Sequence, residues 1–278
     1  MVEGTISSSE RPISAGVPQG SCLSPILYAC YTDDIPVRED VHLALYADDI
    51  ALFSASMSAN HAVTKIQRNL DDLQVWLSKW RLSANVAQLL VRRKTTTRRH
   101  LPLKQLQMYG QTIPWRLSAK YLGIVIDKNL RMARQGRAAA NQAWAAACKL
   151  RPVFTSKLPL KVKLSVYKLY VRTRLTYATP AWYALASRTT KTKMRRVQTK
   201  TLRKIIDAPY YVRNTTIQRD LRIEKLDEHI RRLSTAMFER ADASAWVHLQ
   251  NLVPQHARPP DALPLPRDIV TAEDPQDS

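Results

Sequence analysis

The chain has 278 residues, of which 45% are hydrophobic and 24% charged, and its 43 Lys and Arg residues against 23 Asp and Glu residues give a net charge of +20 at pH 7. This composition is globular and excludes a mostly disordered chain, and no apolar run approaches the ~18 residues that a membrane span needs. The three cysteines lack the spacing of a disulfide framework or a Cys-x-x-Cys metal site, which predicts a reducing intracellular compartment, the cytoplasm or the nucleus.

The N-terminal half is predicted to combine short strands with one long helix. Residues 13–57 indicate a loop, a short helix and a strand–turn–strand, and residues 82–127 indicate short strands. Between them, apolar residues recur every three or four positions over residues 58–80, which is the period of an amphipathic helix. We interpret its apolar stripe as protein core, formed by Val63, Ile66, Leu70, Leu73, Leu77 and Trp80.

From about residue 132 the pattern becomes helical. The prolines at positions 152, 159 and 209 are expected to separate helices over residues 134–150, 160–186, 189–206 and 216–250. After Pro254, proline and acidic residues are frequent and large apolar residues are few, which predicts a disordered tail. The expected fold class is α+β, with an α+β region over residues 1–127, a helical region over 128–253 and a tail over 254–278.

Charge is distributed unevenly along the chain. Residues 1–60 carry a net charge of −6 and residues 261–278 one of −4, which leaves +30 for residues 61–260. Self-repulsion of this size favours a polyanionic partner, and nucleic acid is the partner that we expect. A solvated helical surface and a helical scaffold with no role in nucleic-acid binding are the alternatives.

The first informative motif is Ala-Gly-Val-Pro-Gln-Gly-Ser-Cys-Leu-Ser-Pro over residues 15–25. Two glycines on either side of a rigid proline suit a loop that lets a bulky ligand approach the backbone closely. By itself, such a loop before a helix is more often an ordinary connection than a binding site.

The second motif is an Asp-Asp pair between two apolar segments, in residues 42–53. The two segments predict a buried hairpin, with Asp48 and Asp49 at its tip. Asp is common in turns, so the pair could be turn chemistry alone. Against that interpretation, adjacent carboxylates at the end of a buried sheet repel each other unless a cation lies between them, and a divalent ion with oxygen ligands does this in two-metal phosphoryl transfer.

A second Tyr-x-Asp-Asp sequence occurs at residues 31–34. It follows a predicted helix and is cut off by Ile35 and Pro36, so no second strand can complete a hairpin. We interpret Asp33 and Asp34 as residues of a helix end and a loop.

Together, the Gly-Val-Pro-Gln-Gly-Ser motif and the Tyr-Ala-Asp-Asp motif about 25 residues later resemble the palm of reverse transcriptases. The Leu-Ser-Pro between them, Asp-Ile-Pro at residues 34–36, the long helix ending at Trp80 and Lys-Tyr-Leu-Gly at 120–123 are similar to the jockey-type branch of non-LTR retrotransposons. The resemblance covers residues 1 to about 250, and implies a partial polymerase palm over residues 1–127 followed by a helical thumb.

The resemblance implies roles for individual residues. Asp48 corresponds to a catalytic, metal-ligating carboxylate and Asp49 to its neighbour in the same site, with Mg²⁺ as the expected ion and Mn²⁺ as the alternative. Tyr46 corresponds to the aromatic residue near the incoming nucleotide and the primer end, and Leu122 with Gly123 to the turn that grips the primer. The loop that lines nucleotide and template corresponds to Gly16, Pro18, Gln19, Gly20 and Ser21.

The implied function is that of an RNA-directed DNA polymerase of a mobile element, with an RNA template, a DNA primer and deoxynucleoside triphosphates as partners. Three departures lead us to expect a 5′-truncated copy that is inactive as this chain alone. The family's strand with a further catalytic Asp has no counterpart here, because Glu3 and Glu10 lie too close to the loop. Asn85 is followed by Val86, Ala87 and Gln88 and then directly by apolar residues, with no Lys close behind it as the family has, and we expect no endonuclease before the palm. The alternative is a catalytically dead, basic nucleic-acid-binding remnant.

Overall fold

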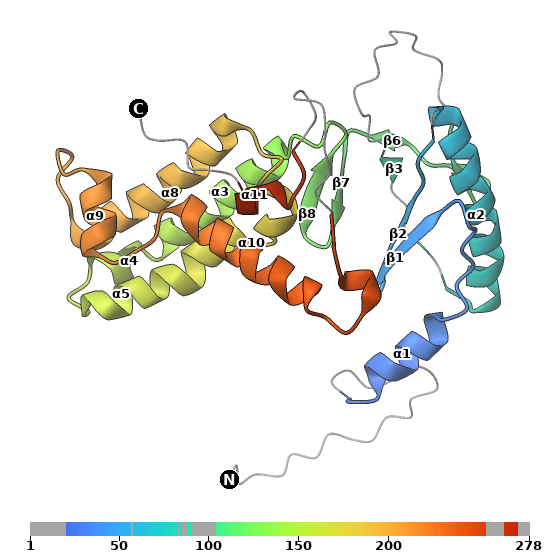
Figure 1. The fold of residues 1–278 in the computed structure, drawn as a ribbon, viewed down its shortest axis with the longest axis horizontal. Helices are drawn as coiled ribbons and strands as arrows, with labels where there is room; N and C mark the ends of the chain where they lie inside the picture. The colour runs from blue at the N-terminus through green and yellow to red at the C-terminus, as the bar shows by residue number, and fades with distance from the viewer. Residues whose placement is uncertain are drawn as a thin grey trace. The chain divides into compact units, whose positions relative to one another are not determined.

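The computed structural model describes residues 21–56, 58–82, 84, 88–89, 104–253 and 264–271 (Figure 1). The chain forms two compact units, one of residues 1–86 and 101–114 and the other of residues 87–100 and 115–278. Helices with small, mostly antiparallel sheets make up the structure, so the α+β fold class is confirmed. The units divide before residue 127, because the strands over residues 115–127 belong with the helices that follow them.

The first unit is built on the long predicted helix. This helix is α2 (Ala59–Lys79), and Val63, Leu70, Leu73 and Leu77 on its apolar stripe are at most 5% exposed. The other elements are α1 (Ser24–Thr32), the hairpin of β1 (His42–Tyr46) and β2 (Asp49–Phe53), and the short hairpin of β4 (Gln107–Met108) and β5 (Gln111–Thr112). The interpretation of the stripe as core is therefore correct for these four residues, whereas Ile66 and Trp80 are half-buried.

Polar contacts hold the connection between α1 and β1 against α2. The buried Asn69 accepts a hydrogen bond from the Arg38 backbone N at 2.8 Å and donates one to the Pro36 carbonyl at 3.2 Å. Trp76 Nε1 donates to the Asp34 carboxylate at 2.8 Å. Asp33 caps the end of α1 and Asp34 lies in the turn after it, so the second Tyr-x-Asp-Asp sequence forms no hairpin, as predicted.

The strands of the second unit join its helical core. β7 (Ser118–Tyr121) and β8 (Ile124–Asp127) form an antiparallel hairpin, and β3 (Gln88–Leu89) pairs in parallel with β6 (Trp115–Arg116). The backbone N of Val125 donates to Gln135 Oε1 at 2.9 Å, and Ile124 and Ile126 pack on the helical core. These contacts explain why residues 115–127 belong to the second unit.

The helical region has more breaks than the sequence indicated. In chain order its elements are α3 (Ala133–Lys149), α4 (Arg151–Thr155), α5 (Leu160–Val166), the π-helical η1 (Tyr167–Arg172), α6 (Thr173–Thr176), α7 (Thr179–Trp182), α8 (Arg188–Ile206), α9 (Asn214–Asp220), α10 (Leu226–Asp242), the 3₁₀ turn η2 (Val247–Leu249) and α11 (Asp268–Thr271). None of the helices in the described ranges is long and apolar enough to cross a membrane.

Two expected helices are wrong in their extent. The one expected over residues 160–186 breaks at Ala178, which has a φ of 50°, because Pro180 begins a new helix rather than continuing the old one. The one expected over residues 216–250 is split between α9 and α10, since the chain turns there to bury Leu221 and Ile223.

The expected disordered tail is wrong for residues 264–271. Residues 268–271 form α11, and Ile269 is buried in the helical core. Arg267 forms a two-pronged ion pair with Asp242 of α10, at 2.8 and 2.9 Å. The other residues of the expected tail lie outside the described ranges.

Gly136 sets the approach of α3 to α8. A Cβ at this position would overlap Cγ2 of the buried Thr190. We expect Gly136→Ala to lower the free energy of unfolding by about 1–2 kcal/mol, because overpacking costs about 1–3 kcal/mol and alanine regains up to about 1 kcal/mol of helix propensity. Urea denaturation followed by circular dichroism measures the change.

Thr190→Ser provides the control for this prediction. It removes the obstructing methyl group and keeps the hydroxyl that lies 3.0 Å from Ser187 Oγ. In that background, Gly136→Ala should no longer destabilise the chain. An equal loss in both backgrounds would show that the contact with Thr190 does not limit the helix approach.

Candidate active site

The Asp-Asp pair lies at the tip of a two-residue hairpin. Tyr46 at the end of β1 pairs with Asp49 at the start of β2, and Ala47 and Asp48 form the turn between them. The predicted position of both carboxylates at a hairpin tip is confirmed. Ala47 has a φ of 50°, a left-handed conformation that non-glycine residues rarely adopt, directly beside Asp48.

The strand register sorts the hairpin into two faces. Residues directly opposite each other in an antiparallel pair share a face, so Tyr46 and Asp49 project from the same side. The next cross-strand pair on that side is Ala44 with Ala51, so only small side chains lie beside Tyr46 and Asp49 on this face. The other face is formed by larger apolar residues, namely Leu43, Leu45, Ile50 and Leu52.

The hairpin is more exposed than the sequence indicated. Tyr46 is 66% exposed and Phe53 54%, and Leu45 and Ile50 on the apolar face are 37% and 36% exposed. The expectation of a buried sheet is therefore wrong for the described residues. The physical reason is the sheet's width, since β1 and β2 pair only with each other there.

Tyr28 of α1 holds the hairpin turn. Its hydroxyl donates a hydrogen bond to the Ala47 carbonyl at 2.7 Å. Burial raises the pKa of Tyr28, and the nearby Asp48 carboxylate raises that pKa further, so the phenol remains a donor at neutral pH. Sequence reasoning missed this residue because no spacing rule connects a helical tyrosine with a turn 19 residues away.

The donor set at the tip fits a divalent ion in part. Asp48 and Asp49 provide carboxylate oxygens, and Mg²⁺ is often held by one or two carboxylates together with substrate phosphates. Within the described ranges, no group of three or more His, Cys, Asp or Glu side chains could hold a metal ion. The tip therefore provides two carboxylates of an oxygen ligand set, and other groups would have to supply the rest.

The loop before α1 lies mostly outside the described residues. This applies to four of the predicted nucleotide-binding and template-binding residues, Gly16, Pro18, Gln19 and Gly20. Ser21 is described, and its hydroxyl accepts a hydrogen bond from the Leu23 backbone N at 3.2 Å, immediately before α1 begins.

The turn predicted to grip a primer joins β7 and β8. Leu122 and Gly123 both have positive φ values, 46° and 78°, as the favoured two-residue hairpin turns with φ above zero at both positions require. The Tyr177 hydroxyl donates to the Leu122 carbonyl at 3.0 Å. A Cβ on Gly123 would lie 3.1 Å from the Tyr177 ring, so this ring is seated directly on the glycine. Tyr177, at the end of α6, is a second positioning residue that sequence reasoning missed.

The basic charge of the second unit is concentrated before residue 207. Residues 128–206 contain twenty Lys and Arg residues and no Asp or Glu, and eight of the twenty lie in α8. Such an excess of one sign attracts a polyanion and is screened by salt.

Three of the cations of α8 have structural roles. Arg195 forms a two-pronged ion pair with Asp227 at 2.5 and 2.9 Å, and Tyr183 donates to the same carboxylate at 2.6 Å. Although burial raises the pKa of Asp227, these hydrogen bonds lower that pKa below its usual value overall. Burial lowers the pKa of Lys191, which lies over the Tyr183 ring, and Arg203 donates to backbone carbonyls of the loop after α8.

The other five cations of α8 form no ion pair within the part of the chain that the structure describes. They are Arg188, Lys193, Arg196, Lys200 and Lys204. Four of these residues are exposed and Lys204 is half-buried, so they can meet an anion from solvent.

Comparison with known proteins identifies the class. Residues 1–126 match the reverse transcriptase (RNA-dependent DNA polymerase) family. Residues 1–126 therefore belong to the reverse transcriptase family. No solved structure matches it significantly.

Among curated proteins, the chain is similar to RNA-directed DNA polymerases of mobile elements, jockey among them, which supports a jockey-type reverse transcriptase. It is 34% identical over 246 residues to the RNA-directed DNA polymerase from mobile element jockey of Drosophila funebris. This alignment covers 85% of this chain and 26% of that protein. It is 32% identical to the RNA-directed DNA polymerase from mobile element jockey of Drosophila melanogaster, in an alignment that covers 84% of this chain and 26% of that protein. It is also 32% identical to the probable RNA-directed DNA polymerase from transposon BS of the same species, in an alignment that covers 91% of this chain and 29% of that protein. The chain thus spans about a quarter of the length of these relatives.

Proposed function

We propose that the chain supplies the palm hairpin and the thumb of an RNA-directed DNA polymerase of a mobile element. Its partners in this function are an RNA template, a DNA primer and deoxynucleoside triphosphates. The observation that carries the proposal is the hairpin tip, where two adjacent carboxylates lie in a turn and Tyr46 shares a face with Asp49.

Asp48 and Asp49 are the residues that would hold Mg²⁺, or Mn²⁺ as the alternative ion. Such an ion supplies positive charge where the primer 3′-hydroxyl attacks the nucleotide α-phosphate. The protein's contribution is to fix the two carboxylates, and the hydrogen bond from Tyr28 to the Ala47 carbonyl supports that role.

The remaining site residues would position the substrates. Tyr46 has an exposed ring that could contact the nucleotide or the primer end, next to the small side chains of Ala44 and Ala51. Gly16 to Ser21 would line the nucleotide and template, as the family resemblance implies. The turn at Leu122 and Gly123, held by Tyr177, would contact the primer backbone.

A chimera tests this function. In it, this chain replaces the matching segment of the Drosophila funebris jockey polymerase, which supplies the rest of the polypeptide. The chimera is expected to extend a DNA primer on an RNA template in Mg²⁺. Asp48→Asn should reduce the rate more than ~100-fold, because misplacing reacting groups by ~1 Å already costs about that factor.

Asp33→Asn is the matched control, because it removes the same charge from an exposed residue outside the hairpin. It should leave the rate within about threefold of the unmutated chimera, given that exposed substitutions away from a site have small effects. A folded chimera that binds an RNA–DNA hybrid without extending it would contradict the proposal and favour the nucleic-acid-binding remnant. Extension that survives Asp48→Asn would contradict the role of the hairpin.

A further inference from the structure

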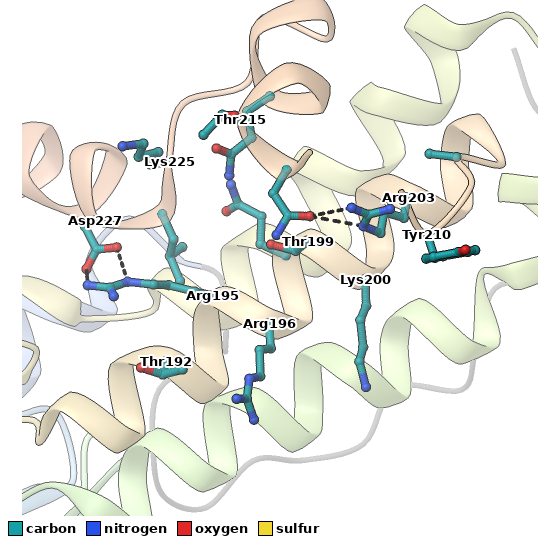
Figure 2. Close-up of a pocket in the computed structure, with 15 residues that line it drawn as sticks. Thr192, Arg195, Arg196, Thr199, Lys200, Arg203, Tyr210, Thr215, Lys225 and Asp227 are labelled. Carbon is teal, nitrogen blue, oxygen red and sulfur yellow. Dashed lines mark hydrogen bonds and ion pairs between the residues drawn. The ribbon is translucent and has the colours of Figure 1, made fainter. Parts of the chain in front are cut away.

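An open groove in the second unit lies between α8, α9 and the start of α10 (Figure 2). Its volume is about 740 Å³, and its lining combines cationic side chains, hydroxyl and amide groups, and one aromatic ring, that of Tyr210. Asp227 also lines the groove, but its charge is neutralised by Arg195 at 2.5 Å. The groove is therefore positively charged and rich in hydrogen-bonding groups.

Two exposed tyrosines lie on the loop between α8 and α9, whose conformation is fixed by hydrogen bonds from Arg203. Arg203 donates to the carbonyls of Pro209 and Val212 and to Asn214 Oδ1, which fastens the loop between α8 and α9. On this loop Tyr210 is 94% exposed and Tyr211 73% exposed, with ring centroids 5.8 Å apart. Tyr210 lines the groove and Tyr211 does not, so Tyr210 is the ring that a flat ligand in the groove could stack on.

Arg196 and Lys200 are the groove's available cations. They are one helical turn apart on α8, about 6 Å along its axis, and in Figure 2 their side chains extend in the same direction. Neither forms an ion pair within the described part of the chain, and Lys200 Nζ lies 5.6 Å from the ring of Trp144. Two cations at this spacing can bind neighbouring phosphates of one strand.

Gln198 adds a third, independent feature. It is 1% exposed and lines the groove, and its Nε2 donates to the Glu224 carbonyl at 2.9 Å. Its Oε1 has no hydrogen-bond partner among the residues that the structure describes. A buried acceptor without a donor costs free energy, so a rearrangement of the groove lining that admits a donor to this oxygen would be favourable, although the oxygen has less than 1 Å² of accessible surface.

We propose that this groove binds a single-stranded segment of nucleic acid, with Arg196 and Lys200 on its phosphates and Tyr210 stacked on an unpaired base. The strand must be unpaired because a duplex hides the base faces that an aromatic side chain stacks on. The inference rests on the proposed function, which supplies nucleic acid as the partner, and adds a site for the part of it that is not in the template–primer duplex.

The test is fluorescence anisotropy on the full 278-residue chain, with labelled oligouridine, oligothymidine and a blunt RNA–DNA hybrid as probes. Tyr210→Leu should weaken binding of the single strands about tenfold, which is within the range measured for stacking of one base, and change binding of the hybrid less than about twofold. Tyr210→Phe should retain binding. Tyr211→Leu is the matched control, because Tyr211 is exposed on the same loop but does not line the groove.

A second variant tests the phosphate contacts. Arg196→Gln together with Lys200→Gln should lower the salt dependence of single-strand binding by about 1.4 in log–log slope, since each phosphate contact contributes about 0.7. Equal binding of the two oligonucleotides would place the recognition in phosphates and base faces, and a preference for oligouridine would add the ribose 2′-hydroxyl to the groups that the groove recognises.

The inference is overturned if Tyr210→Leu leaves the affinity for the single strands unchanged, or if it lowers the affinity for the hybrid by the same factor. In either case the chimera can still extend primers, so the groove would fail while the proposed function stands. If the unmutated chain binds none of the three probes, both the groove and the nucleic-acid partner of the proposed function are wrong.

Discussion

The affinity of the chain for an RNA–DNA hybrid is expected to fall at least about a thousandfold between ~50 mM and ~200 mM salt, as for proteins that make six or more phosphate contacts. The reason is the concentration of twenty cations and no acidic residue over residues 128–206. Five cations of α8 alone form no ion pair in the described structure and can release counterions from phosphates. Filter binding over a salt titration measures the slope.

Base sequence should hardly affect this binding, because phosphate contacts carry no sequence information. Hybrids of different base composition should therefore give the same affinity at each salt concentration. Arg195→Gln is the informative comparison, because Arg195 is already paired with Asp227. This substitution should lower the free energy of unfolding and leave the salt dependence of binding almost unchanged. A slope near zero would instead favour a helical scaffold with no role in nucleic-acid binding.

The parts of the fold that follow from local periodicity could be predicted from the sequence. The apolar stripe from Val63 to Leu77 specifies α2, because a spacing of three and four residues places one face of a helix against a core. The break at Ala178 precedes Pro180, a helix-ending signal that the sequence itself shows, whereas the ordered α11 depends on packing. Arg267, just before α11, forms an ion pair with Asp242, which lies 25 residues earlier. No local sequence pattern predicts a pair over that separation.

The candidate site could be predicted at the level of its motifs but not of its supports. An Asp-Asp pair between two apolar strands is enough to place Asp48 and Asp49 at a hairpin tip. The supports are Tyr28 and Tyr177, which donate hydrogen bonds to the carbonyls of Ala47 and Leu122 across 19 and 55 residues, and no local pattern in the sequence connects them.

The charge pattern has the same limit. It predicted a basic helix, yet Arg195 is used internally by Asp227, 32 residues later, so charge alone does not distinguish structural cations from binding cations.

The isolated 278-residue polypeptide is expected to extend primers at least ~100-fold more slowly than the chimera, because an error of ~1 Å in the position of the reacting groups costs about that much. Two-metal nucleotidyl transfer needs more carboxylate ligands than Asp48 and Asp49 provide, and no cluster of three ligating side chains occurs within the described ranges. The tip should still bind an ion weakly. Electron paramagnetic resonance with Mn²⁺ should detect this binding in the unmutated polypeptide and lose it in Asp48→Asn.

Primer extension by the isolated polypeptide, in Mg²⁺ and then in Mn²⁺, decides whether two carboxylates are enough. Slow or undetectable extension with weak, Asp48-dependent Mn²⁺ binding is the expected result, because Mg²⁺ requires near-octahedral oxygen coordination and gives up its waters reluctantly. If the polypeptide instead extends primers at the chimera's rate and Asp48→Asn abolishes this, a further carboxylate completes the site. Glu10→Gln and Asp33→Asn would then identify it, since only the variant that removes a metal ligand should weaken Mn²⁺ binding and extension together.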